Sequence, residues 1–303
     1  MAIFATAKGI IVVTSGTVLL LDRKGKALKT VTSARTIQTA ALSSKYLAVG
    51  DKAMVVVYTP ELAKVRQFSV KQTCAASVIV SKERYVCGPK NDWDRIFDVY
   101  DLDKGVHLAT SKKYTYNGIP MRRLPGQDYF ITVSGGSPSD FHLYRVNSSD
   151  VPEFVGESPY HGAFAVSTTY AFDAGAVHLV NQTGLLLKVI GKDCSNAFTS
   201  DCFVKDGVLG TLASGQSFIA MSDDQKGKLY GLVQTGGSAW SVDCQKGCEV
   251  QAIDIKQHAI ASKKKHTLAI KRVIDAKHDP VAGSLLVASE VKAGGYQVDS
   301  LPY

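Results

Sequence analysis

The sequence predicts an all-β fold, a β-propeller, and three observations in the 303 residues support this. A segment type recurs about every 40 residues, as expected for a chain built from stacked repeat units. Each segment begins with an alternating or solid run of β-formers, continues through a polar turn and ends in a shorter strand. Units of this size fit the four-stranded blades of a propeller. Seven four-stranded blades is the best count, with six or eight as alternatives.

The recurring segment appears in four clear copies and one weaker copy. They occupy residues 17–30, 53–68, 95–109 and 140–156, with the weaker copy at 176–190. Blades one to five are therefore expected at 2–31, 36–70, 74–111, 117–156 and 161–191. Their second and third strands are predicted at 10–13 and 18–21, 46–50 and 54–58, 85–88 and 96–100, 129–134 and 141–146, and 170–173 and 177–180.

The last two blades are less regular in the sequence. Blade six is expected to contain strands at 207–212, 217–221, 229–234 and 239–242. Blade seven is expected to contain strands at 250–255, 258–261, 267–271 and 284–289. No Pro-rich, Ser-rich or single-charge block divides the chain, so residues 1–303 are predicted to form one domain.

The composition is that of a globular protein, with 45% hydrophobic and 20% charged residues and a formal net charge of +8. The densest basic run is Lys263–His266, followed by Lys271 and Arg272. We interpret the run as a solvated turn between strands, with binding to phosphates or acidic lipid as the alternative. Nucleic acid and membrane lipid are therefore disfavoured as partners.

No apolar stretch approaches the roughly 20 residues that a transmembrane helix needs. Residues 1–13 resemble a signal peptide superficially, but a lysine interrupts the apolar run and the β-branched pattern continues into the first blade. We interpret these residues as strands. A cytoplasmic location is favoured, and a secreted or periplasmic location with a removed leader is the alternative.

Six cysteines form three near pairs in the sequence: Cys74 and Cys87, Cys194 and Cys202, and Cys244 and Cys248. Cys74 and Cys87 are expected to face each other across a hairpin. The spacing of Cys244 and Cys248 would suit a zinc knuckle, but no second ligand pair follows at the usual distance. Disulfides and reduced, packed cysteines are both consistent with this pattern.

Two segments carry a resemblance to a known family. Val18–Asp22 with Gly25, and Phe97–Gly105 with Tyr100 and Asp101, resemble the third strand, turn and fourth strand of WD-repeat propellers. In WD repeats an aromatic residue followed by Asp closes the third strand, and Tyr100–Asp101 matches this pair best. The equivalent pairs in other blades depart from it: Leu21–Asp22, Tyr58–Thr59 and Tyr144–Arg145. The Gly-His dipeptide that usually opens a WD repeat is absent. The resemblance implies a degenerate WD-repeat-like propeller that serves as a platform for protein binding.

Topology predicts where such a platform would bind. In a propeller, the loops joining the second and third strands share a face with the loops between blades. Loops of this kind in blades three to five, at 88–94, 111–117, 134–140 and 157–162, are expected to form one cluster, which we call the loop sector. Aromatic and basic residues there are typical of protein interfaces, and the candidate partner-binding residues are Trp93, Lys112, Lys113, Tyr114, Tyr116, Tyr160 and His161. The alternative is that these side chains only cover strand ends.

Sequence features of catalysis are weak in this chain. Ser134–Ser137 lacks the spacing of a nucleophile elbow, and the paired glycines lack the strand-to-helix context of a phosphate-binding loop. His142 and His178 each follow the start of a predicted strand and are interpreted as packing residues. An enzyme is therefore disfavoured, and no catalytic residue, cofactor or metal site is predicted.

The sequence favours a non-catalytic protein-interaction scaffold that binds a protein partner. Such a scaffold could act alone with its partner or within a multi-subunit complex. The alternative is a secreted or periplasmic propeller, stapled by disulfides, that binds or processes a small molecule or glycan. Lipid binding through Arg122 and Arg123 is disfavoured because the flanking residues differ from those of phosphoinositide-binding propellers.

Overall fold

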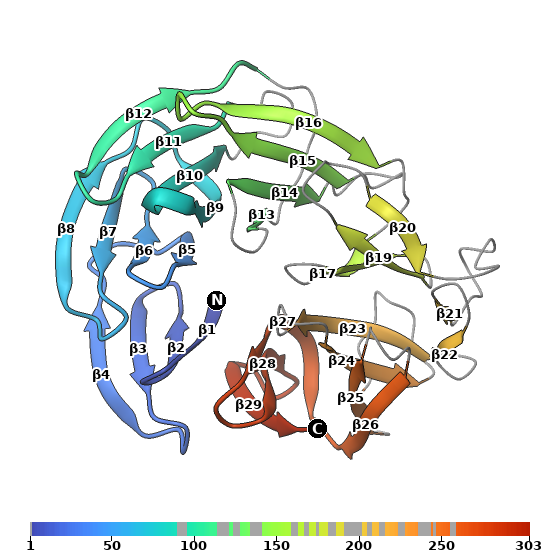
Figure 1. Cartoon of the computed structure of the whole chain (residues 1–303). Helices are drawn as coiled ribbons and strands as arrows, with labels where there is room; N and C mark the ends of the chain where they lie inside the picture. Colours follow the sequence, from blue (N-terminus) through green and yellow to red (C-terminus); the bar gives the residue numbers. More distant parts are fainter. Residues whose placement is uncertain are drawn as a thin grey trace.

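The computed structural model describes residues 2–89, 96–113, 121–123, 128–133, 141–158, 163–166, 170–173, 176–180, 186–190, 202–204, 208–211, 216–223, 228–235, 244, 247–254 and 259–303. These residues form antiparallel sheets, with one short 3₁₀ turn at Ser81–Glu83. Six sheets have four strands, one has three and one has two. The sheets follow one another around a common centre (Figure 1). The all-β prediction is therefore confirmed.

The sheets are up-and-down meanders in chain order. The first two contain β1 (Ala2–Thr6), β2 (Gly9–Val13), β3 (Thr17–Leu21) and β4 (Ala27–Thr32), then β5 (Thr39–Leu42), β6 (Leu47–Gly50), β7 (Met54–Tyr58) and β8 (Lys64–Ser69). The third and fourth contain β9 (Cys74–Val80), β10 (Arg84–Pro89), β11 (Asp98–Asp101) and β12 (Val106–Thr110), then β13 (Met121–Arg123), β14 (Tyr129–Val133), β15 (Phe141–Val146) and β16 (Pro152–Ser158).

The remaining sheets are less uniform. One contains β17 (Ala163–Val166), β18 (Tyr170–Asp173), β19 (Ala176–Val180) and β20 (Leu186–Ile190), and β21 (Cys202–Val204) pairs only with β22 (Val208–Thr211). The next contains β23 (Gln216–Asp223), β24 (Lys228–Thr235), β25 (Cys248–Asp254) and β26 (Ala259–His266). The last contains β27 (Ile270–Asp279), β28 (Ser284–Val291) and β29 (Tyr296–Pro302).

The hydrophobic pattern of each strand matches its depth in the sheet. In the first sheet, all five residues of β2 are buried, β3 alternates between buried and half-buried residues, and β4 is mostly exposed. A solid apolar run therefore lies between two neighbouring sheets, and an alternating run lies nearer the rim. The same gradient recurs from β6 through β7 to β8.

The first strands of successive sheets surround the centre (Figure 1). β5 packs against β9, β9 against β13, β17 against β23, and β23 against β27. The first and last sheets also meet, because β1 packs against β27. Apolar clusters fill the interfaces, such as Val13, Val18, Leu47 and Val49 between the first two sheets.

The predicted grouping of strands in blades six and seven is wrong. Residues 208–211 pair with 202–204 in the two-stranded sheet, so they do not begin the sixth four-stranded sheet. The segments expected to open blade seven, at 250–255 and 258–261, instead overlap β25 and β26 of the preceding sheet. The connection between β24 and β25 is long. A regular spacing of strands therefore assigned the residues of β25 and β26 to blade seven, although they belong to the same sheet as β23 and β24. The predicted strand at 239–242 lies outside the described residues.

The basic run is also corrected, because Lys263, Lys264 and Lys265 lie in strand β26 and not in a turn. β26 is the outer strand of its sheet, and all three lysines are exposed. Lysines on an outer strand oppose pairing between sheet edges.

A β-bulge recurs in the outer strand of all six four-stranded sheets. In each, the register between the third and fourth strands shifts once, leaving one extra residue in the fourth strand. The extra residues are Leu28, Val65, Leu108, Val155, Leu187 and Ala261. A bulge twists the strand locally and disrupts its ladder, so these edges are poor templates for another strand.

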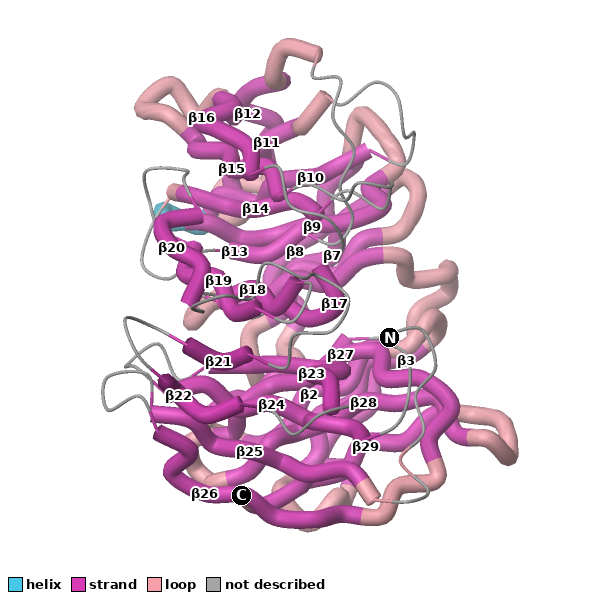
Figure 2. Tube along the Cα trace, turned by 90° about the vertical axis from the view of Figure 1, so that its right-hand side faces the viewer, coloured by secondary structure: helices cyan, strands magenta, loops and turns pink. Residues whose placement is uncertain are grey.

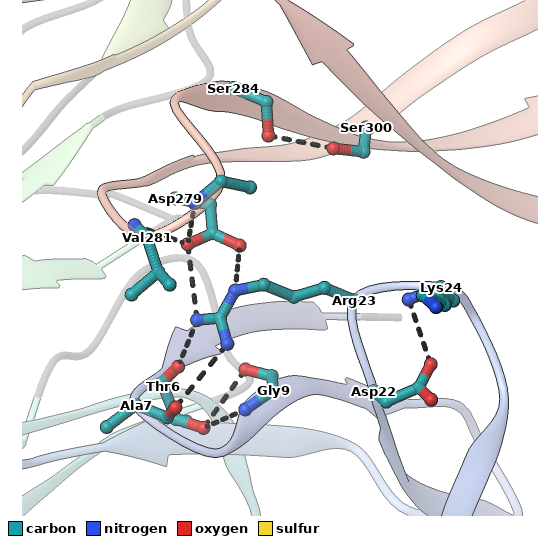
Figure 3. A network of polar contacts seen from close by, with 11 residues as sticks. Thr6, Ala7, Gly9, Asp22, Arg23, Lys24, Asp279, Val281, Ser284 and Ser300 are labelled. Atoms are coloured by element: carbon teal, nitrogen blue, oxygen red, sulfur yellow. Dashed lines mark hydrogen bonds and ion pairs between the residues drawn. The ribbon is translucent and has the colours of Figure 1, made fainter.

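Side chains, and no shared strand, join the first sheet to the last (Figure 3). Arg23 donates from Nε to Asp279 Oδ2 at 3.0 Å and from Nη2 to Oδ1 at 3.3 Å, and Nη2 also donates to the Thr6 carbonyl at 2.7 Å. Ile3 N donates to Asp275 Oδ2 at 3.3 Å. We call this contact the seam. Ile3, Ile10, Val12, Leu286 and Ala288 form its apolar cluster.

Two of the three cysteine pairs form disulfides in this structure. Cys74 bonds Cys87 across β9 and β10, and Cys244 bonds Cys248. Cys194 lies outside the described residues. Among the described residues, no helix is long and apolar enough to cross a membrane.

Candidate functional site

The loop sector is only partly covered by the structure. Lys112 and Lys113 follow β12 and are exposed. Trp93, Tyr114, Tyr116, Tyr160 and His161 lie outside the described residues. The described part of the site therefore consists of the strands and side chains that hold the ends of these loops.

The ladders place the described ends of the loops at one end of their sheets. In the third sheet, Pro89 pairs with Cys74, and Asp98 pairs with Thr110, so the segments after β10 and β12 leave from the same side. In the fourth sheet, Phe141 pairs with both Val133 and Ser158. The connections from β14 to β15 and from β16 to β17 therefore also begin at one end of the sheet.

Polar contacts hold both ends of the segment that contains Trp93. The Cys74–Cys87 disulfide links the two strands at its start, with 5.2 Å between the Cα atoms. At its end, Gln72 Nε2 donates to the carbonyl of Ile96 at 2.7 Å, and Phe97 N donates to Ser111 Oγ at 2.9 Å. Ser111 Oγ donates in turn to the carbonyl of Lys112 at 2.7 Å. The ends of two predicted binding loops are thus connected through one buried serine.

An aromatic cluster lies beneath these anchors. The Phe97 ring centroid is 5.3 Å from that of Phe130 and 4.8 Å from that of Tyr144, and Phe130 stacks on Tyr144 at 5.3 Å. All three side chains are at most 1% exposed. Ring pairs at these distances stabilise a fold beyond their buried area. Because Phe97 comes from the third sheet and the other two from the fourth, the cluster fixes one sheet against the other.

A buried acidic group supports the outer strands of the third sheet. Asp98 Oδ1 accepts a hydrogen bond from Thr110 Oγ1 at 2.6 Å and lies 3.0 Å from His107 Nε2. Asp98 is only 3% exposed, so these partners replace the water it loses on folding.

Hydrogen bonds from Asn147 and Arg145, with the nearby charge of Lys112, lower the pKa of Glu153 in the neighbouring β16. Lys112, which follows β12 of the third sheet, therefore interacts electrostatically with Glu153 of the fourth sheet.

The described geometry suits rigid presentation of loops. Among the described residues, no group of three His, Cys, Asp or Glu side chains is placed to hold a metal ion. His142 is 1% exposed, and its ring centroid lies 6.2 Å from that of Phe154, which confirms its interpretation as a packing residue. The side chain of His178 lies outside the described part of the structure.

Sequence reasoning missed the seam and the recurring bulges. Arg23 and Asp279 are 256 positions apart, and no local pattern indicates that they meet. The bulged residues are ordinary apolar residues in strands. Their spacing from the preceding turn is the only signal that could have revealed them.

Comparisons with known proteins identify the fold. No family model matches the chain, and no curated protein matches its sequence. The solved structures that it resembles include U3-55K, with a TM-score of 0.62 and 10% identity over 98% of this chain and 92% of that one. They also include the WD40 repeats of RRP9, with a TM-score of 0.58 and 11% identity over 95% and 86% of the two chains.

A third similar structure is the hydrazine synthase of Kuenenia stuttgartiensis, with a TM-score of 0.63 and 12% identity over 98% of this chain and 94% of that one. These identities are too low to carry a function across, because one fold hosts many activities. The fold shared with these structures is a β-propeller.

Proposed function

We propose that the chain is a non-catalytic protein-interaction scaffold, a seven-bladed propeller that binds a protein partner through the loop sector. The count of seven rests on the strands that surround the centre, which are β1, β5, β9, β13, β17, β23 and β27 (Figure 1). The two-stranded sheet lies apart from them. β21 packs against β19 and β20, and β22 against β26, so this sheet is an insertion between the fifth and sixth blades.

The observation that carries the proposal is the anchoring of the segment between Pro89 and Ile96. A disulfide, the Gln72 amide and the Ser111 hydroxyl hold its ends over an aromatic cluster. Binding loops whose ends are already fixed lose less conformational entropy on association, which favours affinity. WD-repeat neighbours such as U3-55K and RRP9 agree with a scaffold built in this way.

Affinity purification of the tagged chain from its native source, followed by mass spectrometry, tests this proposal. The double substitution of Trp93→Ala and Tyr114→Ala should remove a stoichiometric protein partner that co-purifies with the wild type. Val65→Ala serves as the control, because Val65 is 39% exposed and lies on β8, the outer strand of the second sheet, outside the loop sector. Retention of the partner by the double variant would contradict the role of the loop sector.

The two disulfides favour a second candidate, a secreted or periplasmic propeller that binds or processes a small molecule or glycan. Disulfides persist in oxidising compartments and are rare in the cytosol. Thiol alkylation of the native protein, with and without prior reduction, tests the oxidised state by mass. If Cys74, Cys87, Cys244 and Cys248 resist alkylation until the protein is reduced, the result supports this candidate. Alkylation of all four without prior reduction would contradict it.

A further inference from the structure

Among the described residues, the last sheet has three strands, one fewer than each four-stranded sheet. β27, β28 and β29 correspond to the first three strands of the four-stranded sheets, and β29 ends the order. Within the described part of the chain, β28 is the only strand that pairs with β29. The backbone groups of β29 that point away from β28 therefore form an edge without a strand partner there. In the part of the chain that the structure describes, His266 Nε2 contacts the Pro302 carbonyl at 3.0 Å, where the end of the chain lies beside β26 (Figure 2).

This edge differs from the others in its regularity. The six four-stranded sheets have a bulge in the outer strand, whereas β28 and β29 pair continuously from Ser284 with Pro302 to Glu290 with Tyr296. The register shifts of the last sheet lie on its other side, between β27 and β28. A regular, uncovered edge is a ready template for another strand.

An exposed aromatic side chain marks the start of β29. Tyr296 is the first residue of this strand and is 60% exposed. An added strand that pairs with β29 would therefore end beside an apolar ring that the described chain leaves uncovered.

Most charged residues on the strands beside the vacant position are basic. The one acidic residue of β29, Asp299, is half-buried and accepts a hydrogen bond from Gln297 Nε2 at 2.7 Å. The outer strands of the two neighbouring sheets are β4 and β26, and neither contains an acidic residue. β4 carries Lys29, and β26 carries Lys263, Lys264 and Lys265, all of them exposed. Lys24 and Lys26, also exposed, lie in the turn that leads into β4. Complementary charge favours an acidic segment between these two groups of lysines.

We propose that an extended acidic segment of a protein partner adds to β29 as the fourth strand of the last sheet. The segment runs antiparallel to β29, as every outer strand does to its neighbour in the other sheets. Backbone hydrogen bonds supply affinity, and the flanking lysines supply selectivity, as in other cases of strand addition. Outer strands here are largely exposed, so the added segment needs no continuous apolar face. This surface is separate from the loop sector.

The test appends a probe strand to the full chain after Tyr303 through a flexible Gly/Ser linker. The probe is the heptapeptide Glu-Val-Glu-Thr-Glu-Val-Glu, and the matched control replaces each Glu with Lys. Tethering raises the effective concentration of the strand. Hydrogen exchange measured by mass spectrometry should then be about tenfold slower at residues 296–302 with the acidic probe than without it.

Charge-reversal variants separate strand pairing from charge selection. K263E with K265E should reduce the protection given by the acidic probe, whereas K112E with K113E, an equal change in net charge, should leave it intact. Unchanged exchange at 296–302 with the acidic probe overturns the proposal. Equal protection by the lysine probe overturns the choice of an acidic partner. Protection that rises with protein concentration in the chain without a probe would identify a second copy as the occupant and overturn it as well.

Discussion

At the scale of single residues, Gly9 has a backbone conformation that other residues rarely adopt. Its φ is 153°, and a Cβ there would overlap the carbonyl oxygen of Leu21 in the neighbouring strand. Because the obstacle is backbone, at the end where β2 begins and β3 ends, no side-chain rotation relieves it.

Gly9→Ala should therefore lower the free energy of unfolding by about 3 kcal/mol, within the range for backbone strain in a core. Chemical denaturation followed by fluorescence measures the change. Gly16→Ala is the control, because Gly16 has nothing within 4 Å of its Cβ position. Equal effects of the two substitutions would show that the backbone around Gly9 adjusts to a Cβ atom with little loss of stability.

Tyr100 is one of the tyrosines whose burial links stability to high pH. Burial raises the pKa of Tyr100 to about 12, and the ring is 1% exposed. Since the unfolded tyrosine ionises near pH 10, the folded state holds its proton more tightly, and this contribution to stability is lost between about pH 10 and pH 12.

Replacing Tyr100 with Phe should flatten the loss of stability between pH 10 and pH 12, measured by urea unfolding at several pH values. The variant also loses the hydrogen bond from Lys71 N, at 2.8 Å, and should be less stable by about 1 kcal/mol at neutral pH. A profile identical to that of the wild type in Y100F would assign the alkaline transition to other groups.

At the scale of elements, strands were predictable where a short turn follows a regular apolar pattern. The predictions for 54–58, 141–146 and 170–173 coincide with β7, β15 and β18. The pattern fixes which residues face neighbouring sheets but carries little information on which strands pair. For that reason the two-stranded insertion at 202–211 and the long connection after Thr235 displaced the predicted blades. The candidate site stays a prediction for Trp93 and the tyrosines, while its anchors at Gln72 and Ser111 depend on contacts that no local pattern reveals.

The two disulfides should stabilise the fold to different extents. Cys74 and Cys87 are separated by 13 positions and Cys244 and Cys248 by 4, so the first restrains a longer loop in the unfolded chain. The loop-entropy relation gives about 3 kcal/mol for the first and about 2 kcal/mol for the second. Thermal unfolding of C74A with C87A, compared with C244A with C248A, checks this order. A larger loss from the second pair would show that strain or packing outweighs loop entropy.

At the scale of the whole molecule, the seam differs from every other boundary between sheets. Successive sheets are tied by the chain itself, through short connections such as residues 33–38 and 70–73. Among the described residues, the first and last sheets share no strand and meet through contacts such as the ion pair of Arg23 with Asp279 (Figure 3) and the hydrogen bond from Ile3 N to Asp275. Because Asp279 has no exposed side-chain surface, loss of its partner leaves a charge that water does not reach.

Arg23→Met should therefore open the seam before the rest of the propeller unfolds. We expect a loss of about 3 kcal/mol, at the lower end of the range for a broken buried pair, because Asp279 Oδ1 keeps hydrogen bonds from Val281 N at 3.0 Å and Ala282 N at 3.3 Å. Native-state hydrogen exchange should accelerate in β1 and β27 and stay unchanged in β9 and β10. Arg35→Met is the matched control, since Arg35 is 57% exposed and lies 3.6 Å from Asp51, a surface pair worth less than about 1 kcal/mol. Uniform acceleration in every sheet would mean that the propeller opens as one cooperative unit and that the seam has no special weakness.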